Sequence, residues 1–487
     1  MKRNLLRVIA LGLLASMLLV SCGTPADTPD DTSASADTTT AAETTTAETE
    51  IVADLPDVKY DGYNFRIFTE DDYIKFVYAD EENGESVNDA VYKSNLAVKE
   101  RFDIKMSIVE QSSWTKWQEI ETVVLAGEDA WDISYTHDCS AGDLSLKGYL
   151  MNLHDIPYLD FEKPWWPKFT QEAMTLNGKM YLLSNYSSWY GFYATRTMFF
   201  NIEMVESNKL DNPYELVKND KWTLDKLIEM TSSFYKDVNG DGKKDYGDIY
   251  GFAMTVPYSL LENFGHEALT KSADGKSVEL TLYNDSMVTL MNKLEAWLIG
   301  GNNGTVFSNK HSGRYNEDSS NTWFSNGTVL YTYGAIGHLL QGLMETDTVY
   351  GILPMPKVTA DQEEYIGACC ELPGVIPVTI KNKERTGVIC EAMAEAGYKN
   401  VIPQYYEYAL KGRYATDPDS CLMLDILFEN RYLSFSYIYR SNNMQRAIEL
   451  VLQNGGNFAS WYETNKPKAL EVVDKINKYF LDGTVTK

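Results

Sequence analysis

The sequence predicts an α/β protein with at least two lobes, and three observations support this class. Segments with strand-like alternation and segments with helical spacing follow one another between Asn64 and Tyr135. A second series of strand and helix candidates begins after about residue 190. The chain has 487 residues, of which 44% are hydrophobic. That is enough for more than one core, because single cores rarely grow beyond roughly 250–300 residues.

The first series has the order strand, helix, strand, helix, strand. Its expected elements are a strand at 64–69, a helix at 87–102, a strand at 104–109, a helix at 114–125 and a strand at 130–135. Strands that alternate with helices in this way form parallel βαβ units. Because ligands of open α/β sheets bind beyond the carboxyl ends of the strands, we expect Tyr135 to Asp138 at the rim of a pocket.

The second series predicts another mixed lobe, followed by a mainly helical part from Lys383 to Phe480. Its expected elements are a strand at 192–200, a helix at 223–235, a strand at 249–256, a helix at 285–299, a long Asn/Gly/Ser-rich loop at 301–320 and a strand at 329–333. Thr223 is a suitable N-cap for the first of these helices, because its hydroxyl can accept a hydrogen bond from a free backbone N–H.

The first twenty-one residues predict an export signal. Lys2, Arg3 and Arg7 form a basic head, and an apolar stretch at 8–20 follows it. This stretch is shorter than the roughly 20 residues that a membrane span needs. Cys22, directly after Leu-Val-Ser, resembles the lipobox of bacterial lipoproteins. The resemblance implies that Cys22 becomes a lipidated N-terminus on the extracellular face of the cell membrane. The alternative is an ordinary signal peptide with an incidental cysteine.

Residues 22–50 predict a disordered tether. They are rich in Thr, Ala, Asp, Glu, Ser and Pro and contain no Lys, Arg or aromatic residue. Such a segment cannot bury enough apolar surface to offset the entropy of ordering, and its like charges keep it extended. Surface enzymes and adhesins use similar tethers, so the segment indicates surface exposure without identifying a function.

Charge and cysteine content narrow the possible functions. The net charge is −27, and it becomes −30 once the three basic residues of the signal are removed. This charge argues against binding of nucleic acid or of anionic lipid, whereas neutral or cationic small solutes remain compatible. Of the six cysteines, five remain after lipidation of Cys22, so they cannot all pair internally. None of them has the spacing of a zinc site, and we expect buried thiols.

A stretch rich in Asp, Asn and Gly carries the sharpest metal-binding pattern. In a calcium loop, alternate residues of a tight turn supply the roughly six to eight oxygens that the ion prefers. The expected ligands are Asp237, Asn239, Asp241, the carbonyl of Lys243, Asp245 and Asp248. Asp248 replaces the longer Glu that usually closes such a loop, so we expect one structural Ca²⁺ site of weak affinity. The alternative is a solvated loop without metal.

Catalytic motifs are mostly missing from the chain. None of its five His lies in HExxH, and no GxSxG or phosphate-binding loop occurs. We therefore expect no enzyme, although the abundant carboxylates leave a glycosidase with paired carboxylates open. Aromatic side chains are a second kind of candidate, because sugar rings stack on them. Trp189 and Trp323 are the best of these, each against the alternative that it packs in the core.

Several stretches resemble the bacterial extracellular solute-binding proteins of ABC transporters, the maltose-binding-like family 1. These stretches are 125–133, 177–182, 200–201 with 222–227, 324–331, 351–356 and 381–384. Their order and spacing, together with the lipobox, make the resemblance specific. The chain departs from the family pattern at Ser184, where Pro is common, and at Trp222-Thr223, whose order is reversed. The regions 256–320 and 400–440 also look enlarged.

The resemblance implies a two-lobed, periplasmic-binding-protein-like (type II) α/β fold with hinge crossings. The implied crossings are near 181–190, 366–376 and 412–420. Lobe 1 is then expected at 51–185 and 376–415, and lobe 2 at 186–375 and 416–487. The resemblance further implies a monomer that closes on its ligand and docks on the permease subunits of an ABC importer.

The expected ligand is a carbohydrate, and more narrowly an oligosaccharide. The residues expected to contribute to its cleft are Tyr135, Asp138, Trp189, Trp323, Tyr333 and Glu371. Two alternatives remain open at this point. One is a surface-anchored glycan-active enzyme. The other is a peptide-binding protein of the same fold, because the acidic charge would suit cationic peptides.

Overall fold

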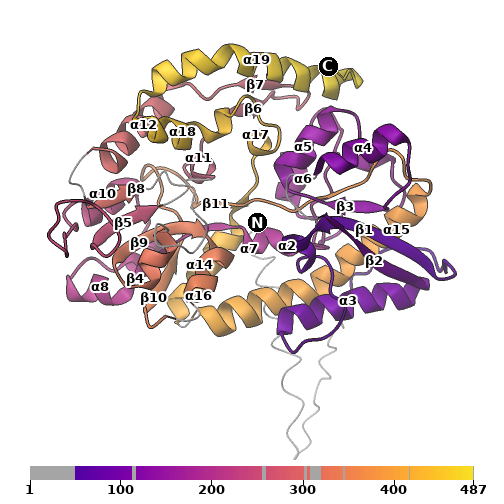
Figure 1. Ribbon diagram of the computed structural model, residues 1–487, viewed down its shortest axis with the longest axis horizontal. Coiled ribbons are helices and arrows are strands. Elements are labelled where there is room, and N and C mark those ends of the chain that lie inside the picture. Colours follow the sequence, from indigo (N-terminus) through magenta and orange to yellow (C-terminus); the bar gives the residue numbers. More distant parts are fainter. Residues whose placement is uncertain are drawn as a thin grey trace, which may run out of the picture. The chain divides into compact units, whose positions relative to one another are not determined.

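Two principal sheets organise the chain from Val52 onward (Figure 1). The structure, a computed structural model, describes residues 50–111, 117–254, 259–300, 304–307, 320–343, 346–415 and 417–485. The predicted signal, Cys22 and the tether up to residue 49 lie outside the described residues. Among the described helices, none is both long and apolar enough to cross a lipid bilayer.

The first sheet confirms the predicted parallel βαβ units. Its strands have the order β12–β3–β1–β2. They span Tyr63–Glu70 (β1), Ile104–Gln111 (β2), Ile133–Tyr135 (β3) and Gly374–Val375 (β12). β1 runs parallel to β2 and β3, whereas β12, which comes from a much later part of the chain, runs antiparallel to β3. The carboxyl ends of β1 and β3 therefore lie at one edge of this sheet.

The second sheet is mixed and has the order β10–β4–β9–β5–β8. Its strands span Arg196–Asn201 (β4), Tyr250–Met254 (β5), Thr305–Phe307 (β8), Val329–Ala335 (β9) and Tyr350–Leu353 (β10). It corrects two predictions. The strand expected at 192–200 begins only at Arg196, because the aromatic residues before it form helix α7 (Tyr190–Tyr193) and pack on Phe76. The loop expected at 301–320 contains β8, whose β-branched residues extend the sheet in parallel with β5.

Helices cover both sheets. The first sheet and the helices around it form lobe 1. These helices are α2 (Asp71–Ile74), α3 (Ser86–Phe102), α4 (Gln118–Ala126), α5 (Asp138–Leu146) and α6 (Lys168–Met174). Those of the second sheet, lobe 2, are α8 (Ile202–Ser207), α9 (Pro213–Lys218), α10 (Leu224–Thr231), α11 (Leu260–Asn263), α12 (Asp285–Leu298), α13 (Ser320–Ser325) and α14 (Ile336–Leu343). α10 begins as predicted, because Thr223 Oγ1 accepts from the backbone N–H of Lys226 at 3.2 Å.

Two extended segments cross between the sheets. The chain leaves the first sheet at Leu183, which bridges to Gly374, and enters the second sheet at Arg196. It returns between the end of β10 and the start of β12. On the way back, β11 (Gly367–Ala368) pairs with β13 (Arg431–Tyr432), which follows α16 (Pro418–Glu429). The two crossings lie beside each other at the candidate ligand-binding site.

A third crossing is a long helix (Figure 1). α15 (Lys383–Ala396) packs on α3 and continues through π-helical turns at 397–401 and 404–414. It leads to α16, which packs on β10. Gly397 lies where this helix passes the first crossing, because a Cβ there would overlap the carbonyl oxygen of Tyr186. π-helical turns are rare in proteins and are frequent at functional sites.

The C-terminal part is mainly helical, as predicted, with α17 (Phe435–Ile438), α18 (Ala447–Gln453) and α19 (Phe458–Asp482). α19 contacts both lobes. Tyr462 stacks on Tyr283, just before α12, with ring centroids 4.8 Å apart. Tyr479 packs on Tyr181 of lobe 1 at 5.3 Å. Between these contacts, α19 also packs on β7 (Val278–Leu280), the partner strand of β6 (Leu269–Lys271).

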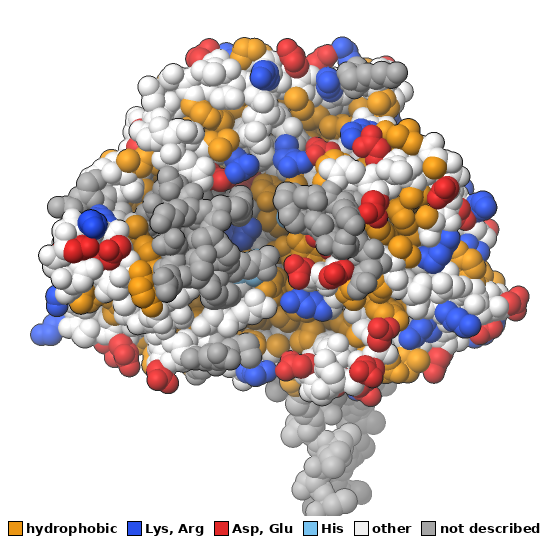
Figure 2. Space-filling view, in the orientation of Figure 1, with side chains coloured by type: hydrophobic (Ala, Val, Ile, Leu, Met, Phe, Trp, Pro, Cys, Tyr) orange, Lys and Arg blue, Asp and Glu red, His pale blue; other side chains and the backbone are white. Residues whose placement is uncertain are grey.

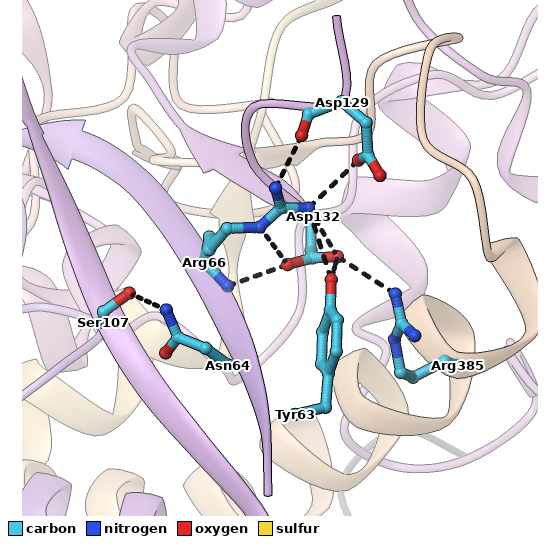
Figure 3. Close-up of polar contacts among 7 residues, drawn as sticks. All are labelled: Tyr63, Asn64, Arg66, Ser107, Asp129, Asp132 and Arg385. Carbon is cyan, nitrogen blue, oxygen red and sulfur yellow. Dashed lines mark hydrogen bonds and ion pairs between the residues drawn. The ribbon is translucent and has the colours of Figure 1, made fainter. Parts of the chain in front are cut away.

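A polar cluster fastens α15 to the beginning of the first sheet (Figure 3). The carboxylate of Asp132 accepts from the hydroxyl of Tyr63 at 2.7 Å and from the backbone N–H of Arg66 at 2.8 Å. It also forms ion pairs with the guanidinium of Arg66 at 3.1 Å and with that of Arg385, on α15, at 3.7 Å. Buried and fully paired, Asp132 connects β1, the entry to β3 and a segment more than 200 residues later.

Candidate ligand-binding site

The candidate site lies where the carboxyl ends of β1 and β3 approach the start of β4. The first sheet contributes Glu70 at the end of β1 and His137 after β3, and the second sheet contributes Arg196. Figure 2 shows a hollow near the middle of the view, whose visible walls are mainly hydrophobic, with Lys or Arg and His side chains among them. The sequence predicted the β3 end of this site, because ligands of α/β sheets bind beyond the strand ends.

Asp138 anchors the lobe 1 side of the site. Its side chain is fully buried, and its carboxylate accepts from the backbone N–H of Cys139 at 2.7 Å and of Glu371 at 3.0 Å. It also forms an ion pair with His137 Nδ1 at 2.7 Å. Although burial opposes a charged ring, Asp138 and Cys139 raise the pKa of His137 well above its ordinary value. The contacts of Asp138 therefore connect the start of α5 in lobe 1 to the extended segment that returns from the second sheet.

Glu371 lies where the two extended crossings pack on each other. A Cβ on Gly191 of α7 would overlap its carboxylate, so glycine permits this close approach. Burial raises the pKa of Glu371 to about 7, although Arg431 opposes the shift. Arg431 in turn lies over the ring of Phe192, with 3.9 Å between its Cζ and the ring centroid. The two predicted residues Asp138 and Glu371 are thus direct neighbours.

Tyr135 and Trp189 connect the first crossing to lobe 1. The hydroxyl of Tyr135 donates to Ser187 Oγ at 2.8 Å. The indole N–H of Trp189 donates to the carbonyl of Lys75 at 3.1 Å. The Trp189 ring packs between Phe76 and Tyr405, with ring centroids at 4.5 and 4.6 Å. Both side chains are buried, so in this structure their contacts are with the protein itself.

The remaining two predicted residues lie in lobe 2. The hydroxyl of Tyr333 donates to Asn263 Oδ1 at 3.1 Å, and this side chain lies near Arg196. Trp323 stacks on Tyr250 with ring centroids 5.4 Å apart, within the core that also holds Phe324. Its described ring contact is therefore with the body of lobe 2, while the other five predicted residues surround the crossings.

Sequence reasoning missed Arg196 and Glu262. Arg196 Nε is buried without a hydrogen-bond partner, and among the described residues its Nη2 donates to Cys370 Sγ, at 3.6 Å. Glu262 on α11 is 2% exposed, and neither of its carboxylate oxygens has a hydrogen-bond partner. Such groups are rare in folded proteins and mark places where another molecule can supply the missing contacts. One signal was present: Arg196 is the only charged residue in the apolar stretch 192–200.

On the lobe 1 side of the site, two threonine hydroxyl groups also lack hydrogen-bond partners in the protein. Thr69 Oγ1 precedes the end of β1, and Thr136 Oγ1 follows β3. The amide nitrogen of Asn185 in the first crossing is also buried without a partner. Together with Arg196 and Glu262, these atoms offer both donors and acceptors at the meeting of the lobes, which suits a ligand rich in hydroxyl groups.

The predicted calcium loop has the backbone form that such a site needs, but its carboxylates make hydrogen bonds of their own. Asp237 accepts from the backbone N–H groups of Gly240 and Gly242, at 2.6 and 2.8 Å. Asn239 accepts from the N–H of Asp241 at 2.9 Å. Asp248, 1% exposed, accepts from the N–H of Val238 at 3.0 Å. The side-chain oxygens of Asp237, Asn239 and Asp241 are of the kind that a hard cation prefers. The carboxylate of Asp248 instead holds the backbone of the loop through its hydrogen bond to Val238.

Within the described residues, one group of three side chains has the closeness of metal ligands: His137, Asp138 and Cys139, with donor atoms within 4.8 Å of one another. His137 Nδ1 lies 2.7 Å from Asp138 and 3.2 Å from Cys139 Sγ. Both distances are those of hydrogen bonds and ion pairs, which explain the closeness without a metal. The predicted calcium residues are not part of this group.

We predict that Glu371→Gln reduces the loss of folding stability that accompanies a rise in pH from 5 to 7.5. The pKa of Glu371 is raised from 4.5 to about 7 on folding, so the unfolded chain ionises first as the pH rises. Folding stability then falls between those two values and levels off above about 7, with about 3 kcal/mol as the upper bound. Glutamine keeps the shape and cannot ionise.

Urea denaturation at several pH values measures this effect. Glu364→Gln is the control, because Glu364 is exposed on the same crossing. Equal pH profiles for wild type and Glu371→Gln would show that Glu371 titrates normally in the folded protein.

Comparisons with known proteins agree with this architecture. No protein-family profile and no curated protein sequence matches the chain. Among solved structures, an ABC substrate-binding protein from Listeria monocytogenes in complex with cycloalternan is 14% identical, with a TM-score of 0.54 over 86% of this chain and 99% of that one. A Thermotoga lettingae solute-binding protein bound with α-D-tagatose is also 14% identical, with a TM-score of 0.54 over 85% and 100%.

A third solved structure gives the same result. It is a cyclo/maltodextrin-binding protein complexed with maltotetraose, 14% identical, with a TM-score of 0.57 over 88% of this chain and 100% of that one. At this identity the likeness concerns the path of the chain. The protein described here thus has the two-lobed α/β fold of ABC solute-binding proteins.

Proposed function

We propose that the protein is the substrate-binding subunit of an ABC importer and that it binds a carbohydrate between its lobes. One observation carries the proposal: several buried polar atoms without hydrogen-bond partners belong to residues at the carboxyl ends of β1 and β3 and at the start of β4. The solved proteins of this fold described above were crystallised with cycloalternan, tagatose and maltotetraose. These three ligands are sugars, which supports the same class of ligand here.

The chemistry of the candidate site suits sugar recognition. Sugar hydroxyls donate to carboxylates and accept from guanidinium and amide groups, and the apolar faces of sugar rings pack on aromatic rings. Glu262 and Arg196 provide the polar part. Tyr190 and Tyr333 lie near Arg196, and both rings are buried in this structure. An oligosaccharide would use several such positions at once, and we propose it as the narrower ligand class.

The proposed setting is the outer face of the cell membrane. Cys22 would carry the lipid, and the tether up to about residue 50 would let the lobes reach the permease subunits, which would take the ligand from a monomeric binding protein. The acidic net charge would favour this anchoring through lipid over adhesion through the protein surface.

We expect a sugar ligand to raise the melting temperature in a screen of mono- and oligosaccharides, with peptides as the comparison class. A ligand at about 100 times its Kd stabilises the folded state by about 2.7 kcal/mol. Calorimetry with the best ligand should show about tenfold weaker binding for Tyr333→Phe, which loses one hydroxyl. Tyr408→Phe is the control, because that side chain is 51% exposed.

The screen also separates the proposal from its alternatives. Binding of peptides without binding of any sugar would contradict the carbohydrate ligand. Chromatography of the sugar after incubation would reveal a glycan-active enzyme, because Glu371 and Asp138 are neighbouring carboxylates and burial raises the pKa of Glu371 to about 7. Recovery of the unchanged sugar is the outcome that the binding function predicts.

We propose that the loop around Asp237 binds one Ca²⁺ as a structural clip. The turn carries three alternating oxygen donors, Asp237, Asn239 and Asp241, in a backbone form held by its own N–H groups. Calcium should raise the melting temperature of protein treated with a chelator, and Asp241→Ala should abolish this rise. Asp274→Ala, at another exposed turn, is the control. Titration calorimetry without a calcium signal would contradict the site.

We predict that Cys22→Ser releases the protein from cells into the medium, because the lipid that would hold it is attached through the thiol. Mass spectrometry of the N-terminal peptide should find diacylglycerol on Cys22 in the wild-type protein. An unmodified Cys22, or membrane retention of the serine variant, would favour the ordinary signal peptide.

A further inference from the structure

Arg196 forms no ion pair with a described carboxylate. It is the first residue of β4, and the titratable groups that act most strongly on its charge are Cys370, Tyr333, Tyr437 and Tyr190. Burial raises the pKa values of this thiol and these hydroxyls, so all four are neutral at pH 7. Within the described residues, no carboxylate lies within 4.0 Å of the Arg196 guanidinium. Its Nε has no hydrogen-bond partner at all.

Most other described arginines have a carboxylate or aromatic partner, although the Nε atoms of Arg385 and Arg431 also lack a hydrogen-bond partner. Arg66, Arg101, Arg385, Arg440 and Arg446 each form an ion pair with a carboxylate. Arg431 is stacked on Phe192 and donates to the hydroxyl of Tyr186 at 3.2 Å. Arg413 is exposed to solvent. Arg196 differs from these arginines, because it lies at the site with neither an ion pair to a described carboxylate nor exposure to solvent at its Nε. Burying a charge without such a partner is unfavourable.

The acidic groups nearby do not supply that partner. Asp138 is committed to His137 and to two backbone N–H groups. Glu262 is buried beside Glu267, and burial together with this second carboxylate raises its pKa well above the ordinary value. The hydroxyl of Ser434 and the charge of Arg196 oppose this rise. The site then offers one guanidinium and one carboxyl group, and neither Arg196 Nε nor the carboxyl oxygens of Glu262 have a hydrogen-bond partner.

We infer that the ligand of this site is an acidic glycan whose carboxylate binds to Arg196. The inference rests on the proposed carbohydrate function and narrows it to sugars such as uronic acids. The guanidinium would bind the carboxylate through two parallel N–H groups. The carboxyl oxygens of Glu262, which have no hydrogen-bond partner, would bind a neighbouring hydroxyl of the sugar.

The net charge of −27 does not decide the sign of the ligand. At physiological ionic strength, exposed charges are screened beyond about 8 Å, so surface carboxylates act mainly on the rate of encounter. Inside the site, the local guanidinium acts at hydrogen-bond distance with little screening. An acidic sugar would thus associate slowly at low salt and faster as salt is added, while dissociation would depend on Arg196.

Calorimetry with matched sugars tests the inference. Galacturonic acid oligosaccharides are compared with galactose oligosaccharides of equal length, and glucuronic acid oligosaccharides with glucose oligosaccharides. We expect the acidic member of at least one pair to bind more tightly by about tenfold or more, as for hydrogen bonds to charged groups. Arg196→Gln should weaken binding of the acidic sugar by about 10- to 150-fold and leave that of the neutral sugar within about threefold. Arg413→Gln is the control, because it removes an exposed arginine.

Each outcome decides between the two proposals. If neutral sugars bind and acidic sugars bind more weakly, the inference is wrong while the carbohydrate function stands. If Arg196→Gln weakens both classes equally, Arg196 is a general hydroxyl ligand and the inference is also wrong. If no sugar of either class binds, both proposals fail. Should Arg196→Gln not fold, the wild-type comparison and the charge-conserving Arg196→Lys variant decide the same question.

Discussion

The hydrogen bond from the backbone N–H of Glu371 to Asp138 is the contact on which the arrangement of the site depends. It joins the beginning of α5 in lobe 1 to the segment that returns from lobe 2. Gly191, in the other crossing, lies against the carboxylate of Glu371, because it has no side chain to prevent this approach. Two connections between the lobes are thereby fixed to each other within a few residues. A ligand placed beside them would contact both lobes and the crossings together.

Most ionisable groups of this region have a partner within the protein. Asp138 is paired with His137, and Arg431 lies close enough to Glu371 to oppose the rise of its pKa. Glu267 accepts from the hydroxyl of Ser434 at 2.8 Å. Arg196, like Glu262, has neither a carboxylate nor a hydroxyl hydrogen-bond partner among the described residues. A ligand that neutralises it would also join β4 to the strand ends of the first sheet, which is the contact that stabilises a closed state.

Much of the fold follows from patterns within short stretches. The alternation at 64–69 and 104–109 and the helical spacing at 87–102 give β1, β2 and α3 because each element buries its own apolar face. The π-helical turns after Gly397 and the passage of α19 across both lobes have no comparable local signal. They depend on partners such as Tyr186 and Tyr181, which are distant in sequence.

The candidate site was predictable only in part for the same reason. Asp138 could be placed because it follows a strand, and strand ends define pockets in this class of fold. Arg196 was missed because 192–200 reads as one apolar strand, whereas α7 interrupts it and makes the arginine the first residue of β4. The ring of Trp323, which we expect at the ligand, stacks on Tyr250 in this structure, and flanking polar residues do not reveal such a contact.

A crystal structure of the full chain with a bound sugar tests the central claim most directly. The claim is that the ligand is held between the lobes, at the meeting of the strand ends of the first sheet with Arg196. The structure should then show sugar density within hydrogen-bond distance of Arg196 and Glu262. Sugar bound only at an outer surface, such as the shallow pocket beside Arg66 and Lys381, would contradict the claim.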